Sequence, residues 1–154
     1  MIPISCPDLS NNEWKYLKDC IDTNWVSSQG KYIKEFEKSF SEYIGVKHSL
    51  TCSNGTTALH LALLAIGAKA RDEIIVPSFT FIATINAIYF CNAKPVFVDI
   101  NSKTWCLNPN EIQDKITSKT KAIIPVHIYG NPANMDEIGK IANKNKLMII
   151  EDCA

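Results

Sequence analysis

Hydrophobic residues recur at helical spacing in two segments near the start of the chain. Apolar residues from Trp14 onward share one face of a segment that follows Ser10-Asn11-Asn12-Glu13, a capping-box pattern that predicts a helix start. A second helix is predicted over residues 31–43, and Gly45 supplies a stop signal. We expect these helices to form an N-terminal segment, residues 1–47, that packs outside the rest of the fold.

After residue 47, short apolar runs alternate with helical patterns. Runs of this kind, separated by helices, predict right-handed βαβ units and a largely parallel sheet over residues 48–154, and therefore an α/β fold. Strands are predicted at residues 48–52, 73–77, 95–99, 121–126 and 146–154, and helices from residue 56 and at residues 81–90, 109–116 and 134–145.

The last predicted strand, residues 146–154, is a nearly continuous apolar run. Such runs are typical of strands in the middle of a parallel sheet, where a helix normally follows. We therefore expect the chain to be the front part of a longer protein whose sheet is incomplete here.

Composition excludes several functional classes. The chain has 154 residues, 46 % of them hydrophobic, and its 16 Lys and Arg balance its 16 Asp and Glu. Without a basic cluster we expect no nucleic-acid partner, and without an apolar run of about 18 residues we expect no membrane span. The N-terminus lacks the pattern of a signal peptide, so we expect a cytoplasmic protein. Its six cysteines have no C-x-x-C spacing, which predicts buried free thiols and neither a metal site nor disulfides.

A polar turn at residues 53–57 precedes a strong helix-forming segment. Ser53, Thr56 and Thr57 offer hydroxyls, and Gly55 has no Cβ to block a ligand and can adopt a positive φ. Unpaired N–H groups at a helix start attract a phosphate or carboxylate. The alternative is a capped helix with no ligand, because such caps are common.

Polar and aromatic residues also follow three other predicted strands. Ligands in open α/β sheets bind at the carboxyl ends of strands, where residues 53–57, 77–81, 127–130 and 151–152 would meet. The turn at residues 53–57 would hold an anion and is called the anion cradle below. Together with an aromatic ring for stacking and a carboxylate, it suits a flat, phosphorylated, nitrogen-containing ring, such as pyridoxal 5'-phosphate (PLP). The alternatives are that Phe81 is a core residue and that Asp152 caps a following helix.

The chain resembles the DegT/DnrJ/StrS family of sugar aminotransferases, and within it the perosamine-synthase type. One departure is Arg71, where the family usually has glycine. The resemblance implies an aspartate-aminotransferase-like fold (fold type I) with three layers. Residues 1–154 would be the N-terminal part of the PLP-binding large domain of that fold. The matching stretches are residues 36–47, 53–63, 72–84, 93–99, 120–130 and 149–154.

The resemblance also implies roles for individual residues. The lysine that carries the cofactor in this family lies beyond the Glu-Asp strand end, and no lysine of this chain matches it, so no catalytic residue is assigned. The implied cofactor-binding residues are Gly55, Thr56 and Thr57 for the phosphate, Phe81 for stacking and Asp152 for the ring nitrogen. The candidate substrate-binding residues are Trp25, Ser27 and His127, with a structural role as the alternative for His127.

The implied activity of the full-length protein is PLP-dependent amination, at C4, of a nucleotide-linked keto-deoxysugar, with glutamate as donor, for amino-sugar and polysaccharide biosynthesis. A homodimer is implied too, with Trp14 and Phe36 covered in the assembly. Residues 1–154 alone are expected to be inactive. The alternatives are a sugar dehydratase with histidine in place of the lysine, or a non-catalytic regulator that binds cofactor or sugar. A nicotinamide-binding domain lacks support, because no G-x-G-x-x-G occurs.

Overall fold

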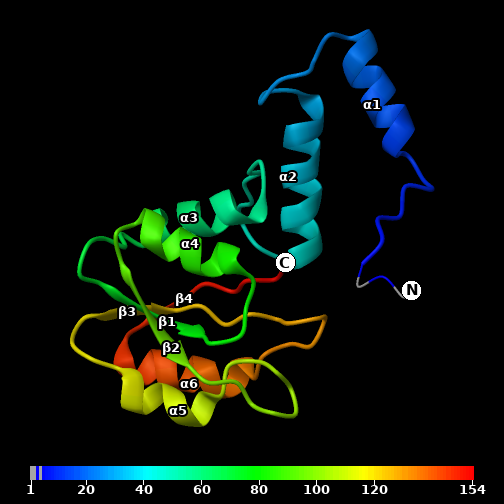
Figure 1. Ribbon diagram of the computed structural model, residues 1–154. Coiled ribbons are helices and arrows are strands. Elements are labelled where there is room, and N and C mark those ends of the chain that lie inside the picture. The colour runs from blue at the N-terminus through cyan, green and yellow to red at the C-terminus, as the bar shows by residue number, and fades with distance from the viewer. Residues whose placement is uncertain (1–2, 4) are drawn as a thin grey trace. The chain divides into compact units, whose positions relative to one another are not determined.

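The computed structural model describes residue 3 and residues 5–154 (Figure 1). The chain divides into two compact units, of which unit 1 extends to Thr51 and unit 2 comprises Cys52–Ala154. Each unit is a separate body and is described by itself.

Unit 1 contains two helices, α1 (Glu13–Asp22) and α2 (Lys31–Ile44). Both match the predicted segments, and Gly45 ends α2 in the left-handed region with φ +77°, as its glycine predicted. Neither helix has a fully buried residue, and Trp14 is 73 % exposed. The apolar faces of these helices are therefore uncovered within the described part of unit 1.

The predicted capping box at the start of α1 is wrong. The residue before the helix is Asn12, and its side chain accepts no capping hydrogen bond. The Ser10 N–H donates to Asp8 instead, while the Glu13 carboxylate accepts from the Asn11 N–H. The Asp8 and Glu13 side chains therefore bond backbone N–H groups ahead of the helix, and local bonds of this kind compete with a cap.

The strand predicted at residues 48–52 is also wrong, because this segment is irregular. Glu37 of α2 takes up its polar groups: the Glu37 carboxylate accepts from the Thr51 N–H and hydroxyl, and the Glu37 carbonyl accepts from the Ser49 hydroxyl. Leu50 is 76 % exposed. A short apolar pattern becomes a strand only where a neighbouring strand can pair with it, and here a helix is the partner.

Unit 2 is built on the predicted parallel sheet. Its strands are β1 (Glu73–Pro77), β2 (Lys94–Val98), β3 (Thr120–Ile123) and β4 (Met148–Ile149), in the order β2-β1-β3-β4. All three pairings are parallel. The four strands therefore end at the same edge of the sheet.

Two strands are shorter than predicted. β3 ends before Pro125, which has no N–H to donate to a ladder. Pairing resumes beyond it as an isolated bridge between Val126 and Asp152. β4 covers two residues rather than nine, and Met148 is 50 % exposed because β4 pairs on one side only within the described chain.

Helices cover both faces of the sheet, which gives the three predicted layers (Figure 1). α3 (Gly55–Ala65) and α4 (Ile82–Phe90) pack on one face, and α5 (Pro109–Lys115) and α6 (Met135–Asn145) pack on the other. Asn108 caps α5 ahead of Pro109, and the Asn134 side chain accepts from the Glu137 N–H at the start of α6, so both predicted starts are confirmed.

The core alternates along each strand. Ile74 and Val76 pack with Leu63 and Ile88 of the first pair of helices, whereas Ile75 packs on the opposite face with residues of α5 and α6. Each fully buried aliphatic side chain contributes about 1.5–3 kcal/mol relative to exposure. Burial on both faces explains why β1 reads as an uninterrupted apolar run.

The cysteine prediction needs correction, although all six are free. Cys91 and Cys106 are buried, Cys20 is half-buried, and Cys6, Cys52 and Cys153 are exposed. The prediction of buried thiols rests on the typical burial of free cysteine. Cys6, Cys52 and Cys153 differ from it because they lie in irregular segments outside the core. Among the described residues, no helix is long and apolar enough to cross a membrane, and no cluster of side chains suits a metal ion.

Candidate active site

The carboxyl edge of the sheet gathers several of the predicted site residues. Phe81 follows β1, His127 follows β3 and Asp152 follows β4. α3 and α4 lie side by side, and their N-terminal ends point to the side of unit 2 at which the strands end (Figure 1). The edge therefore combines two helix starts with the side chains of three strand ends.

Asp152 is buried and fixed from several directions. It is 7 % exposed, and its Oδ2 accepts a hydrogen bond from the Thr84 hydroxyl at 2.7 Å. Its Oδ1 accepts from the Ala154 N–H at 3.2 Å. Its backbone N–H donates to the Pro125 carbonyl, and its carbonyl accepts from the His127 N–H. The carboxylate is thus held by α4 and the Ala154 N–H, and the backbone of Asp152 is held by the extension of β3.

No cationic side chain pairs with Asp152 among residues 3 and 5–154. A buried carboxylate is costly unless it is paired as well as hydrogen-bonded. Its two side-chain oxygens accept from the Thr84 hydroxyl of a preceding helix and from the Ala154 N–H, and the second of these bonds is the kind that the helix-capping alternative predicts. The chemistry of this position therefore fits a cationic ligand, such as a protonated ring nitrogen.

Phe81 stands at the start of α4. It is the N-cap residue rather than the first helical residue, and its side chain is 76 % exposed. Its carbonyl accepts from the Thr84 N–H, so Phe81 is only one helical turn from the residue that holds Asp152. The structure brings these two predicted residues to the same helix end, and the alternative of a core phenylalanine is wrong within the described chain.

The predicted anion cradle begins α3. Asn54 and Thr57 form a complete capping box: the Asn54 side chain accepts from the Thr57 N–H, and the Thr57 hydroxyl accepts from the Asn54 N–H. The N–H groups of Gly55 and Thr56, the first two helical residues, have no partner within the helix. Gly55 does not use a positive φ, and a Cβ placed there would meet nothing within 4 Å.

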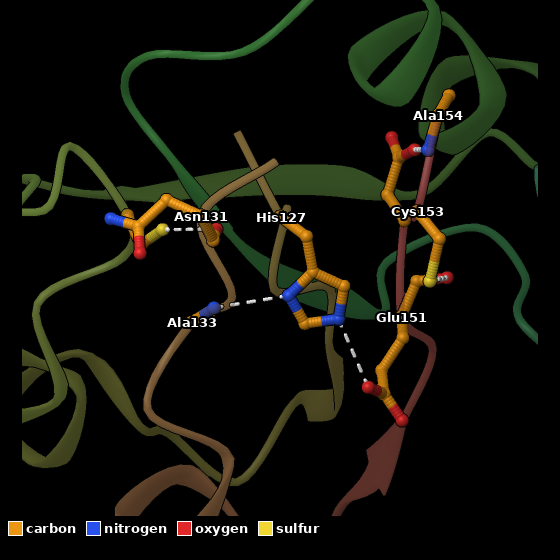
Figure 2. A network of polar contacts seen from close by, with 8 residues as sticks. His127, Asn131, Ala133, Glu151, Cys153 and Ala154 are labelled. Atoms are coloured by element: carbon orange, nitrogen blue, oxygen red, sulfur yellow. Dashed lines mark hydrogen bonds and ion pairs between the residues drawn. The ribbon is translucent and has the colours of Figure 1, made fainter. Parts of the chain in front are cut away.

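His127 and Glu151 form a second polar pair at this edge. The His127 Nε2 lies 3.0 Å from Glu151 Oε2, and its Nδ1 accepts from the Ala133 N–H at 3.0 Å (Figure 2). Because Nδ1 is the acceptor, a neutral imidazole carries its proton on Nε2. Both ring nitrogens are engaged, so His127 joins the loop after β3 to the segment after β4.

Three aromatic side chains from different strand-end loops also meet. The Phe79 ring lies 5.5 Å from Trp105 and 6.4 Å from Tyr129, measured between ring centroids. Trp105 and Tyr129 have positive φ values, +63° and +50°, which are uncommon for aromatic residues. All three rings remain partly exposed, which leaves apolar surface beside the edge.

Trp25 and Ser27, the other predicted substrate-binding residues, lie in unit 1. Trp25 lines a groove of about 620 Å³ together with Gly30, Ile33 and Glu37. Ser27 lines a smaller neighbouring cavity of about 90 Å³ with Tyr32. Their role toward the substrate stays a prediction.

Sequence reasoning missed Thr84, whose hydroxyl holds Asp152. Thr84 is completely buried, with 0 % of its surface exposed to solvent, and lies on the apolar face of α4. The available signal was a hydroxyl among Ile85 and Ile88 in a helix, because a buried hydroxyl requires a polar partner. The identity of that partner, 68 positions away, is visible only in the fold.

The pattern that defines the DegT/DnrJ/EryC1/StrS aminotransferase family matches residues 7–154. A GDP-perosamine synthase of Escherichia coli O157:H7 is 48 % identical over 153 residues, which are 99 % of this chain and 42 % of that protein. The chain therefore spans less than half the length of this relative.

Solved structures agree with the sequence match. A Bacillus subtilis protein, NtdA, with the cofactor PMP bound, superposes with a TM-score of 0.86 and 40 % identity, over 90 % of this chain and 32 % of that one. A GDP-4-keto-6-deoxy-D-mannose-3-dehydratase of E. coli with hydrated PLP bound gives 0.89 and 30 %, over 99 % and 40 %. The predicted fold class, that of fold type I PLP enzymes, is confirmed. The chain belongs to the DegT/DnrJ/EryC1/StrS aminotransferase family.

Proposed function

We propose that the full-length protein is a PLP-dependent aminotransferase that acts on a nucleotide-linked 4-keto-6-deoxy sugar. The observation that carries the proposal is Asp152, a buried carboxylate with hydrogen-bond donors on both oxygens and no cationic side chain beside it in the described chain. A protonated ring nitrogen would supply the missing positive charge.

The remaining cofactor contacts are assigned to two helix starts. The N–H groups of Gly55 and Thr56 are directed by the helix toward an anion, and the dipole of α3 favours a phosphate there. Thr57 keeps this turn in shape through its capping box with Asn54. Phe81, exposed at the start of α4, offers its ring for stacking.

PLP supplies, when bound, an electron-poor ring that accepts the electron pair of a carbon–hydrogen bond broken beside the substrate nitrogen. Asp152 keeps a proton on the ring nitrogen, and a ring that remains protonated accepts this electron pair better. The buried position of Asp152 excludes water from its oxygens, which strengthens the interaction. The residues of this chain therefore bind and polarise the cofactor.

The substrate assignment rests on the relative named GDP-perosamine synthase. It supports amination at C4 of the sugar, glutamate as the amino donor and a role in amino-sugar biosynthesis for polysaccharides. Trp25, Ser27 and His127 are our candidates for contacts with the sugar nucleotide. Of these, His127 has both ring nitrogens occupied, so its contact would be made by the ring face or through Glu151.

A homodimer forms part of the proposal. Trp14 and Phe36 are 73 % and 57 % exposed on helices without a buried residue, and apolar surface of this kind is typical of interfaces. Sedimentation velocity of the full-length protein should give the mass of two chains. A fully active monomer would contradict the dimer and leave the cofactor assignment standing.

The experiment adds PLP to purified full-length protein, then glutamate and a GDP-linked 4-keto-6-deoxy sugar, and analyses the product by mass spectrometry. We expect a specific cofactor absorption band and an amino sugar. Phe81→Ala should weaken cofactor binding, whereas Phe90→Ala, at the exposed far end of the same helix, should not. Absence of a specific band would overturn the proposal.

A sugar dehydratase is the second candidate, because a GDP-4-keto-6-deoxy-D-mannose-3-dehydratase has the same fold at 30 % identity. The same assay separates the two activities. A dehydratase removes the C3 hydroxyl and leaves oxygen at C4, whereas an aminotransferase places nitrogen on the sugar. A protein that binds PLP but forms neither product would fit the third alternative, a non-catalytic regulator.

A further inference from the structure

Two threonine hydroxyls and the Asp152 carboxylate are joined in series by hydrogen bonds. The Thr84 Oγ1 lies 2.7 Å from Asp152 Oδ2, and the Thr80 Oγ1 lies 2.8 Å from Thr84 Oγ1. Thr84 is completely buried and Thr80 is half-buried between β1 and α4. The loop after β1 and the first turn of α4 are thus connected to the strand end that carries the carboxylate.

The direction of these hydrogen bonds follows from counting hydrogens. A threonine hydroxyl has one hydrogen, and Thr84 donates it to Asp152. Thr84 must therefore accept from Thr80, which is the donor of the pair 2.8 Å apart. Both O–H dipoles point toward the carboxylate, and hydrogen bonds aligned in this way strengthen one another.

We propose that Thr84 is the positioning residue that holds the Asp152 carboxylate oriented toward the cofactor ring nitrogen. This inference rests on the proposed function, because it assigns Asp152 to a protonated ring. Thr84 and the Ala154 N–H each occupy one oxygen of Asp152, so the carboxylate cannot rotate freely. Each oxygen keeps capacity for a further donor.

The effect on the ring follows from where a shared proton resides. A hydrogen bond donated to a carboxylate favours its charged form over the acid. With the Thr84 hydroxyl present, the proton shared between Asp152 and the ring nitrogen stays on nitrogen. Without the hydroxyl the proton moves toward the carboxylate, and the ring becomes less electron-poor.

A purely structural role is the competing explanation, since any buried hydroxyl needs a partner. The same unit contains a matched control at the other end of β1. There the Thr117 hydroxyl donates to Glu73 Oε2 at 2.6 Å, another threonine–carboxylate bond with a buried carboxylate. Thr117→Val removes a bond of the same kind at the opposite edge of the sheet.

The test compares Thr84→Val, Thr84→Ser and Thr117→Val in the full-length protein loaded with PLP that is ¹⁵N-labelled at the ring nitrogen. The readouts are the ¹⁵N chemical shift, the cofactor dissociation constant and the melting temperature. For Thr84→Val we expect a shift toward the unprotonated value and about three- to tenfold weaker cofactor binding, because a charge-assisted hydrogen bond is lost. Thr84→Ser should restore both, and Thr117→Val should change only the melting temperature.

The outcomes separate the inference from the proposed function. If Asp152→Asn moves the ¹⁵N shift but Thr84→Val does not, the positioning role is overturned and the cofactor assignment stands. If Thr117→Val moves the shift as much as Thr84→Val, the effect is one of general stability and the inference also fails. If the unaltered protein binds no PLP, both are wrong.

Discussion

His127 and Glu151 are joined side chain to side chain, with 3.0 Å between the imidazole Nε2 and the carboxylate Oε2, at the ends of β3 and β4 (Figure 2). The other imidazole nitrogen accepts from the Ala133 N–H. The histidine therefore bridges two chain segments that both lie next to Asp152. His127 therefore helps to fix the positions of these two segments relative to each other.

His127→Ala should lower the free energy of unfolding by about 1–3 kcal/mol, because it leaves the N–H of the buried residue Ala133 without its acceptor. Glu151→Ala should cost less than about 1 kcal/mol, since the Glu151 side chain is 49 % exposed and water can replace it. Urea unfolding of the two variants measures the difference. Equal losses would show that the His127–Glu151 contact, and not the Ala133 contact, matters.

Asp152→Asn should reduce turnover of the full-length enzyme by about a hundredfold or more, because a neutral amide cannot hold the proton on the ring nitrogen. Stability should change far less, since the amide oxygen can still accept from the Thr84 hydroxyl. Single-turnover kinetics and a thermal melt should be run on the same preparation. Near-normal turnover would remove Asp152 from the ring nitrogen.

Glu73 makes stability depend on acid pH. The Thr117 hydroxyl, and then Lys94, hold the pKa of this buried carboxyl below its usual range. A lowered pKa stabilises the fold above the unfolded pKa, about 4.3, and the contribution disappears as the pH falls through the folded pKa. Glu73→Gln should therefore melt about 2–4 °C lower at pH 7, the shift expected for about 1 kcal/mol.

That difference should shrink as the pH falls through the lowered pKa of Glu73 in the fold, because the unaltered carboxyl then takes up its proton. Melts of both proteins at pH 7, 5, 4 and 3 check this. A difference that stays constant over the series would mean that the charge of Glu73 contributes nothing.

Arg71 occupies a backbone position that favours glycine. Its φ is +75°, in the left-handed region, and its side chain is exposed. Non-glycine residues pay about 1 kcal/mol for this conformation, so Arg71→Gly should stabilise unit 2 by about 0.5–1 kcal/mol. Arg71→Ala is the control that removes the same charge but keeps the strain. A rise in melting temperature for alanine as large as for glycine would point to charge instead.

Local patterns were sufficient where a segment is bounded by strong signals. α5 begins where Asn108 and Pro109 predicted, and Gly45 ends α2 in the left-handed region. β1, with turn residues on both sides, has its predicted bounds at residues 73–77. In each case the cap, the proline or the apolar run acts over a few neighbouring residues, so its effect can be read from the sequence.

The errors share a different cause. Residues 48–52 and the segment after Lys146 have apolar residues, but whether they form strands depends on a partner. Glu37 takes the polar groups of the first segment, and β4 has one pairing neighbour in the described chain. Pairing of strands joins residues far apart in the chain, and no local pattern contains that choice.

The sequence by itself determined the class of fold and pointed to Gly55, Phe81 and Asp152, because turn chemistry, periodicity and a family resemblance act at the level of short stretches. Only the tertiary structure decided which groups serve these residues. It placed the Thr84 hydroxyl on Asp152, 68 positions away, and left that carboxylate buried without a cationic side chain within the described residues. Burial and hydrogen-bond partners are properties of the packed chain, since they depend on what surrounds a side chain in space.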